Sequence, residues 1–139
     1  MDLIVAIILW LYQYTGLSLA VYTFSEEQRL TYTPSASRDP SVAVNGETIH
    51  VVWIDYEDVS DSEIYYLKSV NGGVTWGSSS RITDNDDADM SPYLVASNQH
   101  IYLAYSGIRP SSGDRSDIFF RYSRDNGQTW SEETNVSNS

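Results

Sequence analysis

The residues that could do chemistry in this chain are mostly acidic, with three arginines among them. The arginines Arg38, Arg109 and Arg115 could each hold an anionic ligand, because a guanidinium group binds a carboxylate through two parallel hydrogen bonds. With Asp55 they form a candidate ligand-binding face, and the alternative for each arginine is a solvent-exposed loop side chain. The acidic residues concentrate in two stretches: Asp55, Glu57, Asp58, Asp61, Glu63, Asp84, Asp86, Asp87 and Asp89.

The acidic run that ends at Asp89 could bind calcium. Asp84, Asp86 and Asp89 supply, at spaced positions, the oxygen ligands that Ca²⁺ prefers. The run lacks the glycine and the downstream glutamate of an EF-hand loop, and a solvated acidic turn is the alternative. No other cofactor is indicated, and the absence of cysteine excludes thiolate metal sites, thiol nucleophiles and disulfides. We expect His50 and His100 to lie on strand surfaces, because they share no pattern of ligand partners.

The composition predicts a folded chain rich in β-structure. Of its 139 residues, 13% are aromatic and 19% are charged, and eleven tyrosines and four tryptophans suit half-buried sheet surfaces. The formal net charge is −11. Nucleic-acid binding is therefore not expected, since phosphate contacts need clustered basic side chains.

Two eight-residue motifs share the pattern S-x-[D/N]-x-G-x-T-W. The first motif is Ser69–Trp76 and the second motif is Ser123–Trp130. An Asx residue followed by glycine between apolar runs is a hairpin signal, because glycine accepts positive φ and the Asx side chain can bind backbone N–H groups. We expect the tryptophan to begin the returning strand and to pack between neighbouring sheets. The residues with this structural role are Ser69, Asn71, Gly73, Thr75, Trp76, Ser123, Asp125, Gly127, Thr129 and Trp130.

Both motifs belong to a longer internal repeat. Residues 40–44 align with residues 92–96, which lie 52 positions later, and the offset rises to 54 before the motifs. A partial copy, an outer strand from Phe24 to Thr31, precedes them. Short β-branched and aromatic strands at this period predict propeller blades, and an eight-stranded β-sandwich is the alternative. The expected strands lie near 41–45, 49–55, 63–69, 75–83, 92–97, 100–106, 117–123 and 129–137.

The motif resembles the Asp-box (BNR) repeat of sialidase-type β-propellers. The resemblance implies an all-β fold of four-stranded antiparallel blades, here about residues 40–84 and 92–138 of a partial propeller spanning 21–139. A ring typically needs four to eight blades. Two blades and one extra outer strand therefore predict a portion of a larger propeller. The missing blades would come from the same longer chain or from identical copies.

The same resemblance implies a division between two faces of the protein. In related sialidases the Asp boxes lie at the blade periphery and the active site lies on the opposite face. Three arginines there bind an anionic sugar, and a tyrosine acts as nucleophile beside a carboxylate acid/base. The family's Phe-Arg-Ile-Pro motif is absent here, and Arg109 lies in a loop between the second and third strands of its copy. The catalytic residues therefore stay unknown.

The first twenty residues predict an export segment. Residues 3–11 form an apolar run about as long as the core of a signal peptide, and small residues before Val21 fit a cleavage site. The segment contains Asp2 and no positive charge, and its uncharged stretch could extend to Phe24 as a membrane anchor. A buried strand or a wrongly placed start is the remaining alternative. Residues 1–20 are thus predicted to be a signal peptide or membrane anchor, with the chain secreted or anchored outside the cytoplasm.

Together these patterns predict an exported Asp-box propeller domain that binds or processes glycans, as a fragment of a sialidase-like protein. One alternative is a non-catalytic propeller scaffold that binds protein or glycan. Another is a lectin-like protomer that completes a ring by oligomerisation. The expected partner is a glycan or an extracellular protein, and whether the chain is an enzyme stays open because a fold alone does not fix a function.

Overall fold

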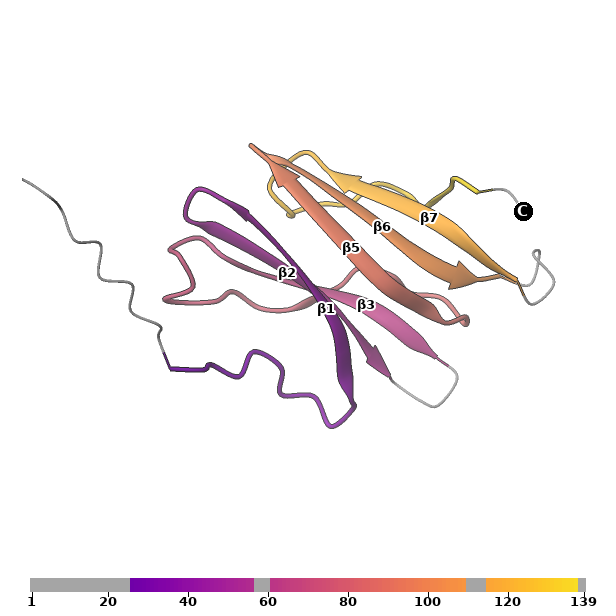
Figure 1. The fold of residues 1–139 in the computed structure, drawn as a ribbon, viewed down its shortest axis with the longest axis horizontal. Helices are drawn as coiled ribbons and strands as arrows, with labels where there is room; N and C mark the ends of the chain where they lie inside the picture. The colour runs from indigo at the N-terminus through magenta and orange to yellow at the C-terminus, as the bar shows by residue number, and fades with distance from the viewer. Residues whose placement is uncertain (1–25, 57–60, 110–114, 138–139) are drawn as a thin grey trace, which may run out of the picture.

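The computed structural model describes residues 26–56, 61–109 and 115–137. These residues form two four-stranded antiparallel sheets and no helix, which confirms the all-β class and the four strands predicted for each copy (Figure 1). Within these ranges no helix is long and apolar enough to cross a membrane, and the predicted export segment lies outside them. Sheet A consists, in order, of β1 (Ser37–Asn45), β2 (Thr48–Tyr56), β3 (Ser62–Ser69) and β4 (Ser80–Arg81). Sheet B consists of β5 (Asp89–Ser97), β6 (His100–Ile108), β7 (Ser116–Ser123) and β8 (Thr134–Asn135).

Both sheets begin with the same irregularity, which places their first strands earlier than predicted. β1 begins at residue 37 and β5 at residue 89, not at 41 and 92. The register of each first strand pair shifts near a proline, where Asp39 and Ser91 have positive φ values of 49° and 52°. Proline cannot donate a hydrogen bond to a ladder, so the sequence suggested a strand start there. A bulge instead lets the pairing continue on both sides of it.

The fourth strands are much shorter than predicted, and the tryptophans do not begin them. β4 and β8 pair with β3 and β7 through two residues each, several positions after Trp76 and Trp130. One backbone bond bridges the gap in each sheet, from Gly77 N to Lys68 O (3.0 Å) and from Ser131 N to Tyr122 O (2.8 Å). The residues after Trp76 are small and polar, and such residues form strands poorly.

The predicted outer strand from Phe24 to Thr31 is wrong for its described part. Residues 26–31 form no strand, and Phe24 lies outside the described residues. The segment nevertheless packs on sheet A, where Leu30 joins a cluster with Val51, Trp53 and Leu67. A strand needs a neighbour with which to exchange backbone hydrogen bonds, and no described strand pairs with this segment.

The main core lies between the two sheets. Side chains alternate along each strand, so Val52, Ile54 and Ile64 of sheet A point toward Leu103 and Phe119 of sheet B. All five are nearly or fully buried. Full burial of one such side chain contributes about 1.5–3 kcal/mol. The apolar interface between the sheets is thus the main source of stability in the described structure.

The two sheets are stacked with the same orientation, so that equivalent faces point the same way. The face of sheet B that meets sheet A corresponds, position by position, to the face of sheet A that meets residues 26–33. Leu103 in sheet B corresponds to Val51 in sheet A at the offset of 52, and Phe119 corresponds to Tyr65 at the offset of 54. Each sheet therefore presents its equivalent face toward the preceding part of the chain.

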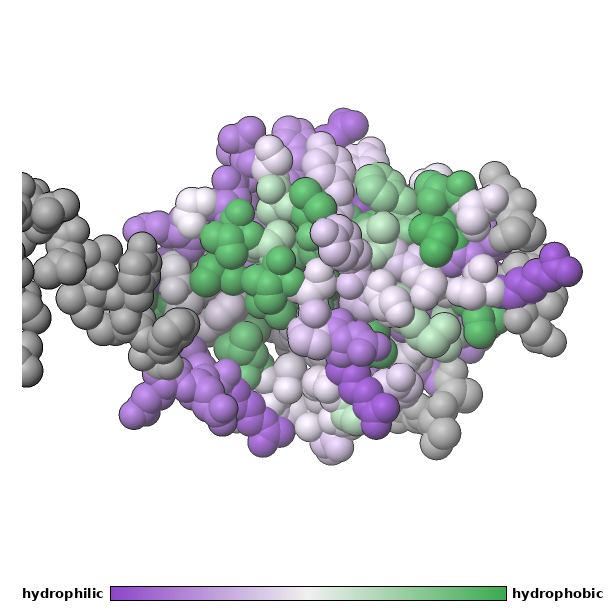
Figure 2. All heavy atoms as spheres, in the orientation of Figure 1, coloured by the Kyte–Doolittle hydropathy of each residue, from purple (hydrophilic) through white to green (hydrophobic). Residues whose placement is uncertain are grey.

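Apolar side chains remain exposed on the outward faces of this stack. On sheet A, Val42 and Val44 are 55% and 60% exposed; on sheet B, Tyr93 and Val95 are 68% and 47% exposed. Figure 2 shows apolar side chains at the surface among the polar ones on one side of the molecule. The described residues thus leave part of both outward faces uncovered.

Candidate functional site

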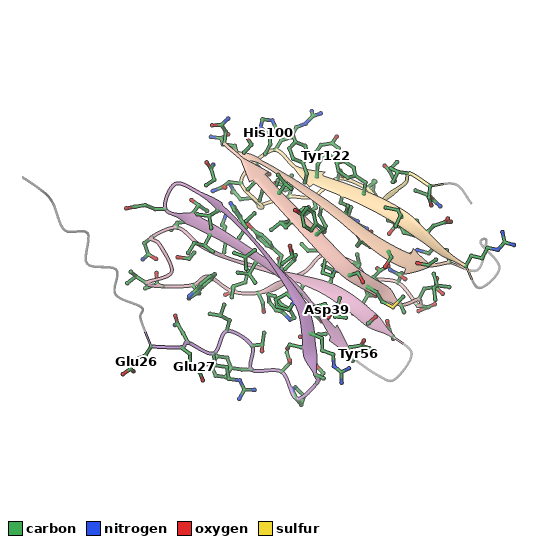
Figure 3. The ribbon with its side chains drawn as sticks, in the orientation of Figure 1. Glu26, Glu27, Asp39, Tyr56, His100 and Tyr122 are labelled. Carbon is green, nitrogen blue, oxygen red and sulfur yellow. The ribbon has the colours of Figure 1, made fainter. Side chains whose placement is uncertain are left out.

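The two motifs lie at one end of the sheets, and the connections between second and third strands lie at the other. In sheet B, His100 and Tyr122 mark the motif end, whereas Tyr56 and Asp39 mark the opposite end of sheet A (Figure 3). We call the second end the polar end. The predicted ligand-face residues all belong to it, because they lie at or beyond the strand ends there: Arg38, Asp55, Arg109 and Arg115.

The polar atoms of the first motif hold its own turn. Ser69 Oγ accepts a hydrogen bond from Gly73 N (2.8 Å), and Asn71 Oδ1 accepts one from Thr75 N (2.9 Å). Asn71 Nδ2 donates to Thr75 Oγ1 (2.9 Å). Gly73 has φ +88°, a conformation that favours glycine.

The second motif has equivalent hydrogen bonds, except that donor and acceptor are exchanged in the bond between the Asx and threonine side chains. Gly127 N donates to Ser123 Oγ (2.9 Å), and Thr129 N donates to Asp125 Oδ1 (2.9 Å). Here the threonine hydroxyl donates, since Asp125 Oδ2 accepts from Thr129 Oγ1 (2.5 Å). Hydrogen bonds from Thr129, together with those from Ser123 and Gln128, hold the pKa of Asp125 well below its usual range. In both motifs the Asx side chain is directed into the turn.

The second motif also joins sheet B to sheet A. The Trp130 ring meets the Tyr66 ring edge-on, with centroids 5.5 Å apart, and Lys68 Nζ donates to Asn126 O (2.7 Å). Gly127 lies so close to Tyr66 that an added Cβ would overlap the phenol ring. The predicted packing of Trp130 between sheets is therefore present.

His50 lies beneath this contact, so its predicted place on a strand surface is wrong. It is fully buried, and its Nδ1 lies 2.8 Å from Tyr66 Oη. Burial and then the nearby Lys68 charge lower the pKa of His50. The second motif covers this part of sheet A, which the sequence of β2 alone does not reveal.

Four carboxylates are buried at the polar end. Their residues are at most 3% exposed, which is rare for acidic residues unless they are paired or hydrogen-bonded. Each sheet contributes two of them, one near the first strand pair and one at the start of the third strand. They are Asp55 and Glu63 in sheet A and Asp89 and Asp117 in sheet B.

The first carboxylate of each sheet occupies the same place but comes from a different strand. In sheet A, Asp55 of β2 accepts from its partner Ser37 (2.5 Å) and from Thr33 (3.2 Å). In sheet B the carboxylate is on β5: Asp89 pairs with Gly107 in the ladder and accepts from Asn85 (2.9 Å). A Cβ at Gly107 would lie 2.6 Å from Asp89 Oδ1, so the glycine makes room for this carboxylate.

Arg109 joins this carboxylate to a second one. Its Nη2 lies 2.8 Å from Asp89 Oδ1 and 2.7 Å from Glu133 Oε2, and its guanidinium lies over the Phe119 ring (4.3 Å). Tyr105 donates to Glu133 (2.5 Å). Arg109 is thus engaged by carboxylates of its own chain.

Burial and pairing act in opposite directions on these acids. Burial raises the pKa of Asp89, and the Arg109 charge offsets only part of that effect. Burial also acts to raise the pKa of Glu133, but hydrogen bonds from Arg109 and Tyr105 outweigh it, and the net pKa is lowered. Two carboxylates share the Arg109 guanidinium, and the nearby Arg121 charge also acts to lower the pKa of Glu133.

The carboxylates at the start of the third strands fix the chain after the fourth strands. Glu63 accepts from Arg81 Nη2 (2.6 Å) and from Asn85 N (2.7 Å). Asp117 accepts from Asn135 Nδ2 (2.8 Å) and from Ser137 Oγ (2.7 Å). These buried acids therefore hold the segments that leave the sheets.

The exposed part of the polar end carries the remaining candidate residues. Arg38 is exposed and lies over the Tyr56 ring (5.4 Å), and Arg115 is exposed before β7. Asp84 is exposed beside Arg81, at 3.2 Å, and Asp86 is exposed as well. Glu57 and Asp58 lie outside the described residues.

The three acids proposed for calcium are not brought together. Asp84 and Asp86 are exposed, whereas Asp89 is buried against Asn85 and Arg109. Among the described residues, no group of three His, Cys, Asp or Glu side chains could hold a metal ion.

Several residues of these clusters were not found from the sequence. Glu133 and Tyr105 approach Arg109 only through the fold, and no short motif links them. The repeat did contain a signal for the first carboxylate, because Thr33 and Ser37 align with Asn85 and Asp89 at the offset of 52.

The fold and the polar end define an all-β protein built of stacked four-stranded sheets, and solved structures share that fold. No protein-family profile matches the chain, and no curated protein matches it significantly. The chain is similar to Zg3597, a family 117 glycoside hydrolase produced by the marine bacterium Zobellia galactanivorans. The TM-score is 0.55 and the identity 14%, over 78% of this chain and 42% of that one. The chain thus spans less than half the length of that enzyme, and the likeness concerns the fold.

Proposed function

We propose that this chain is a two-blade portion of a sialidase-like Asp-box β-propeller that binds or processes glycans at its polar end. The observation that carries the proposal is the separation of the two ends. Both motifs turn their polar atoms into their own hairpins at one end, while arginines and carboxylates gather at the other.

The stacking of the sheets supports the propeller. Sheets that repeat in one direction leave an open face at each end of the series, and a ring of four to eight blades removes those faces. The exposed Val44 and Tyr93 lie on such outward faces. The missing blades come from a longer chain or from identical copies.

A glycan suits the exposed part of the polar end. Arg38 over Tyr56 offers a cationic donor beside an aromatic ring, and Arg115 adds a second exposed guanidinium. The similarity to a glycoside hydrolase supports the same ligand class. Among the described residues, Asp89 and Glu133 are held by Arg109, so we assign binding to this portion.

Export is part of the proposal. Residues 1–20 are a signal peptide or membrane anchor, and the mature chain begins at Val21 when the segment is cleaved. Mass determination of the chain from a secreting host tests this point, since an intact Met1 on protein recovered from the medium contradicts cleavage.

An array of sialylated and neutral oligosaccharides tests the glycan assignment. We expect Arg38→Ala and Arg115→Ala each to weaken binding, and Arg38→Lys to retain more of it than Arg38→Ala. Gln128→Ala, at the motif end, is the matched remote control. Equal binding by all four variants and wild type would contradict a site at the polar end. Hydrolysis of a fluorogenic sialoside by this chain alone would contradict the binding role assigned to it.

A further inference from the structure

The outward face of sheet B carries a row of neighbouring rings, of which the first two pairs are stacked and the last pair is tilted. The centroids of His100 and Tyr102 lie 6.4 Å apart, those of Tyr102 and Phe120 6.2 Å apart, and those of Phe120 and Tyr122 6.4 Å apart. The Arg124 guanidinium lies 4.9 Å from the centre of the Tyr122 ring. His100, Tyr102, Tyr122 and Arg124 line a hollow of about 340 Å³. His100 and Tyr122 lie at the motif end (Figure 3).

The corresponding positions on sheet A are covered by the second motif. At the repeat offsets of 52 and 54, Tyr102 corresponds to His50, Phe120 to Tyr66 and Tyr122 to Lys68. In sheet A, Tyr66 contacts Trp130 and Gly127, and Lys68 binds the carbonyl of Asn126. The place that is hollow on sheet B is thus filled, on sheet A, by a hairpin motif of the next unit.

We propose that the outward face of sheet B is the docking surface for a further unit of the same repeat. The hairpin motif of that unit covers the hollow, and its tryptophan packs on Phe120. This inference rests on the propeller part of the proposed function, not on its glycan part. It continues the interface already present between sheets A and B.

The extent of the apolar face favours a sheet over a sugar as its occupant. Beyond the rings, Tyr93, Val95 and Ile118 are 68%, 47% and 44% exposed on the same face. Val95 pairs with Tyr102 beside the hollow, whereas Tyr93 and Ile118 lie further along the strands from it. A ligand seated on the rings alone would leave Tyr93 and Ile118 in water. A four-stranded sheet covers both areas at once, as sheet B does for sheet A.

The contacts of the second motif on sheet A indicate which groups a further unit needs in order to dock on sheet B. Its motif needs a glycine above Phe120, because Gly127 has no room for a side chain above Tyr66. Its turn needs a carbonyl oxygen in the place of Asn126 O, which Lys68 binds in sheet A. On sheet B, Arg124 and the Tyr122 hydroxyl supply the donors for that carbonyl.

A chain extended by one unit tests the proposal. A copy of residues 85–139 is joined after Asn138, the residue that aligns with Asp84. Phe120→Ala is then made in the original chain and, at the original position only, in the extended chain. We expect a small fall in Tm in the original chain and a fall several degrees larger in the extended one, because the substitution then leaves a cavity in an interface. Tyr66→Ala, already in an interface, should lower Tm strongly in both.

Equal effects of Phe120→Ala in the two chains would overturn the proposal. An added unit that melts separately from the original chain would do the same, since it would be tethered but not docked. If Phe120→Ala prevents folding of the original chain, Tyr102→Ala provides the same comparison. If an oligosaccharide protects the rings and the added unit does not change the effect of Phe120→Ala on Tm, the face would be assigned to a sugar instead. Failure of glycan binding at Arg38 and Arg115 leaves this test unaffected.

Discussion

The two motifs have almost the same internal bonds and very different neighbours. In each, the serine and the Asx side chain accept the same backbone N–H groups of the turn. Outside the turn, Gly127 and Trp130 press against Tyr66 of the other sheet, whereas an added Cβ at Gly73 would meet only Ile49 and Trp76 of its own sheet. The internal bonds therefore make a hairpin, and the external contacts join one sheet to the next.

The largest expected difference is between the two tryptophans. Trp130→Ala should lower the free energy of unfolding by about 3–5 kcal/mol, because the ring packs between the sheets. Trp76→Ala should cost roughly 1–2 kcal/mol, since its ring packs at the edge of the smaller cluster and borders a cavity of about 680 Å³. Urea denaturation of the two variants measures both values. Equal losses would show that the contact with Tyr66 adds nothing.

The next difference concerns the buried carboxylate that comes from the second strand in sheet A, as Asp55, and from the first strand in sheet B, as Asp89. Asp89→Ser should cost roughly 1–3 kcal/mol, because Arg109 and Asn85 lose a buried acceptor. Gly107→Asp alone should cost more, since its Cβ has no room beside Asp89. The double variant reproduces the Ser37–Asp55 arrangement of sheet A and should be more stable than Gly107→Asp. Strictly additive losses in urea denaturation would show that the two sheets do not share this position.

The glycines of the motifs give a smaller contrast. Both have positive φ, so an alanine at either position costs about 1–2 kcal/mol in backbone strain. Gly127→Ala should cost roughly 1–3 kcal/mol more than Gly73→Ala, because only Gly127 lies against a buried ring. Thermal unfolding of the two variants measures the difference. Combining Gly127→Ala with Tyr66→Ala should remove most of that excess, and its persistence would contradict the steric explanation.

The repeat in the sequence is enough to predict the second and third strands and the two ends of each sheet. Alternating apolar residues and Asx-Gly turns are local signals, and the second and third strands lie within a few residues of their predicted bounds. The fourth strands pair through only two residues each, although β3 and β7 have eight residues. In sheet A the small polar residues after Trp76 form strands poorly, and the repeat alone does not reveal this shortening.

The candidate site was predicted only as a region. The sequence placed Arg109 in an acidic setting, but its partner Glu133 is 24 residues away and reaches it through the fold of sheet B. The predicted surface position of His50 is wrong because the sequence of β2 contains no signal for the motif that covers it. Burial between sheets depends on long-range packing, so single residues of this kind need the three-dimensional structure.

The smallest expected effect is a difference between Asp125 and Asn71 in how the stability of their motifs depends on pH. Asp125 has a lowered pKa, so the ionised carboxylate stabilises the folded state above the unfolded pKa of about 3.9, and this contribution is lost as pH falls through the folded value. Asn71 makes the same turn without a titrating group. Asp125→Asn should therefore lower Tm at pH 7 by more than at pH 3, while the reverse substitution, Asn71→Asp, should add a similar dependence to the first motif. The difference in Tm between each variant and wild type, followed from pH 7 to pH 3, measures this effect. A difference in Tm that stays constant with pH would show that the hydrogen bonds of the turn stabilise the second motif and that the charge of Asp125 does not.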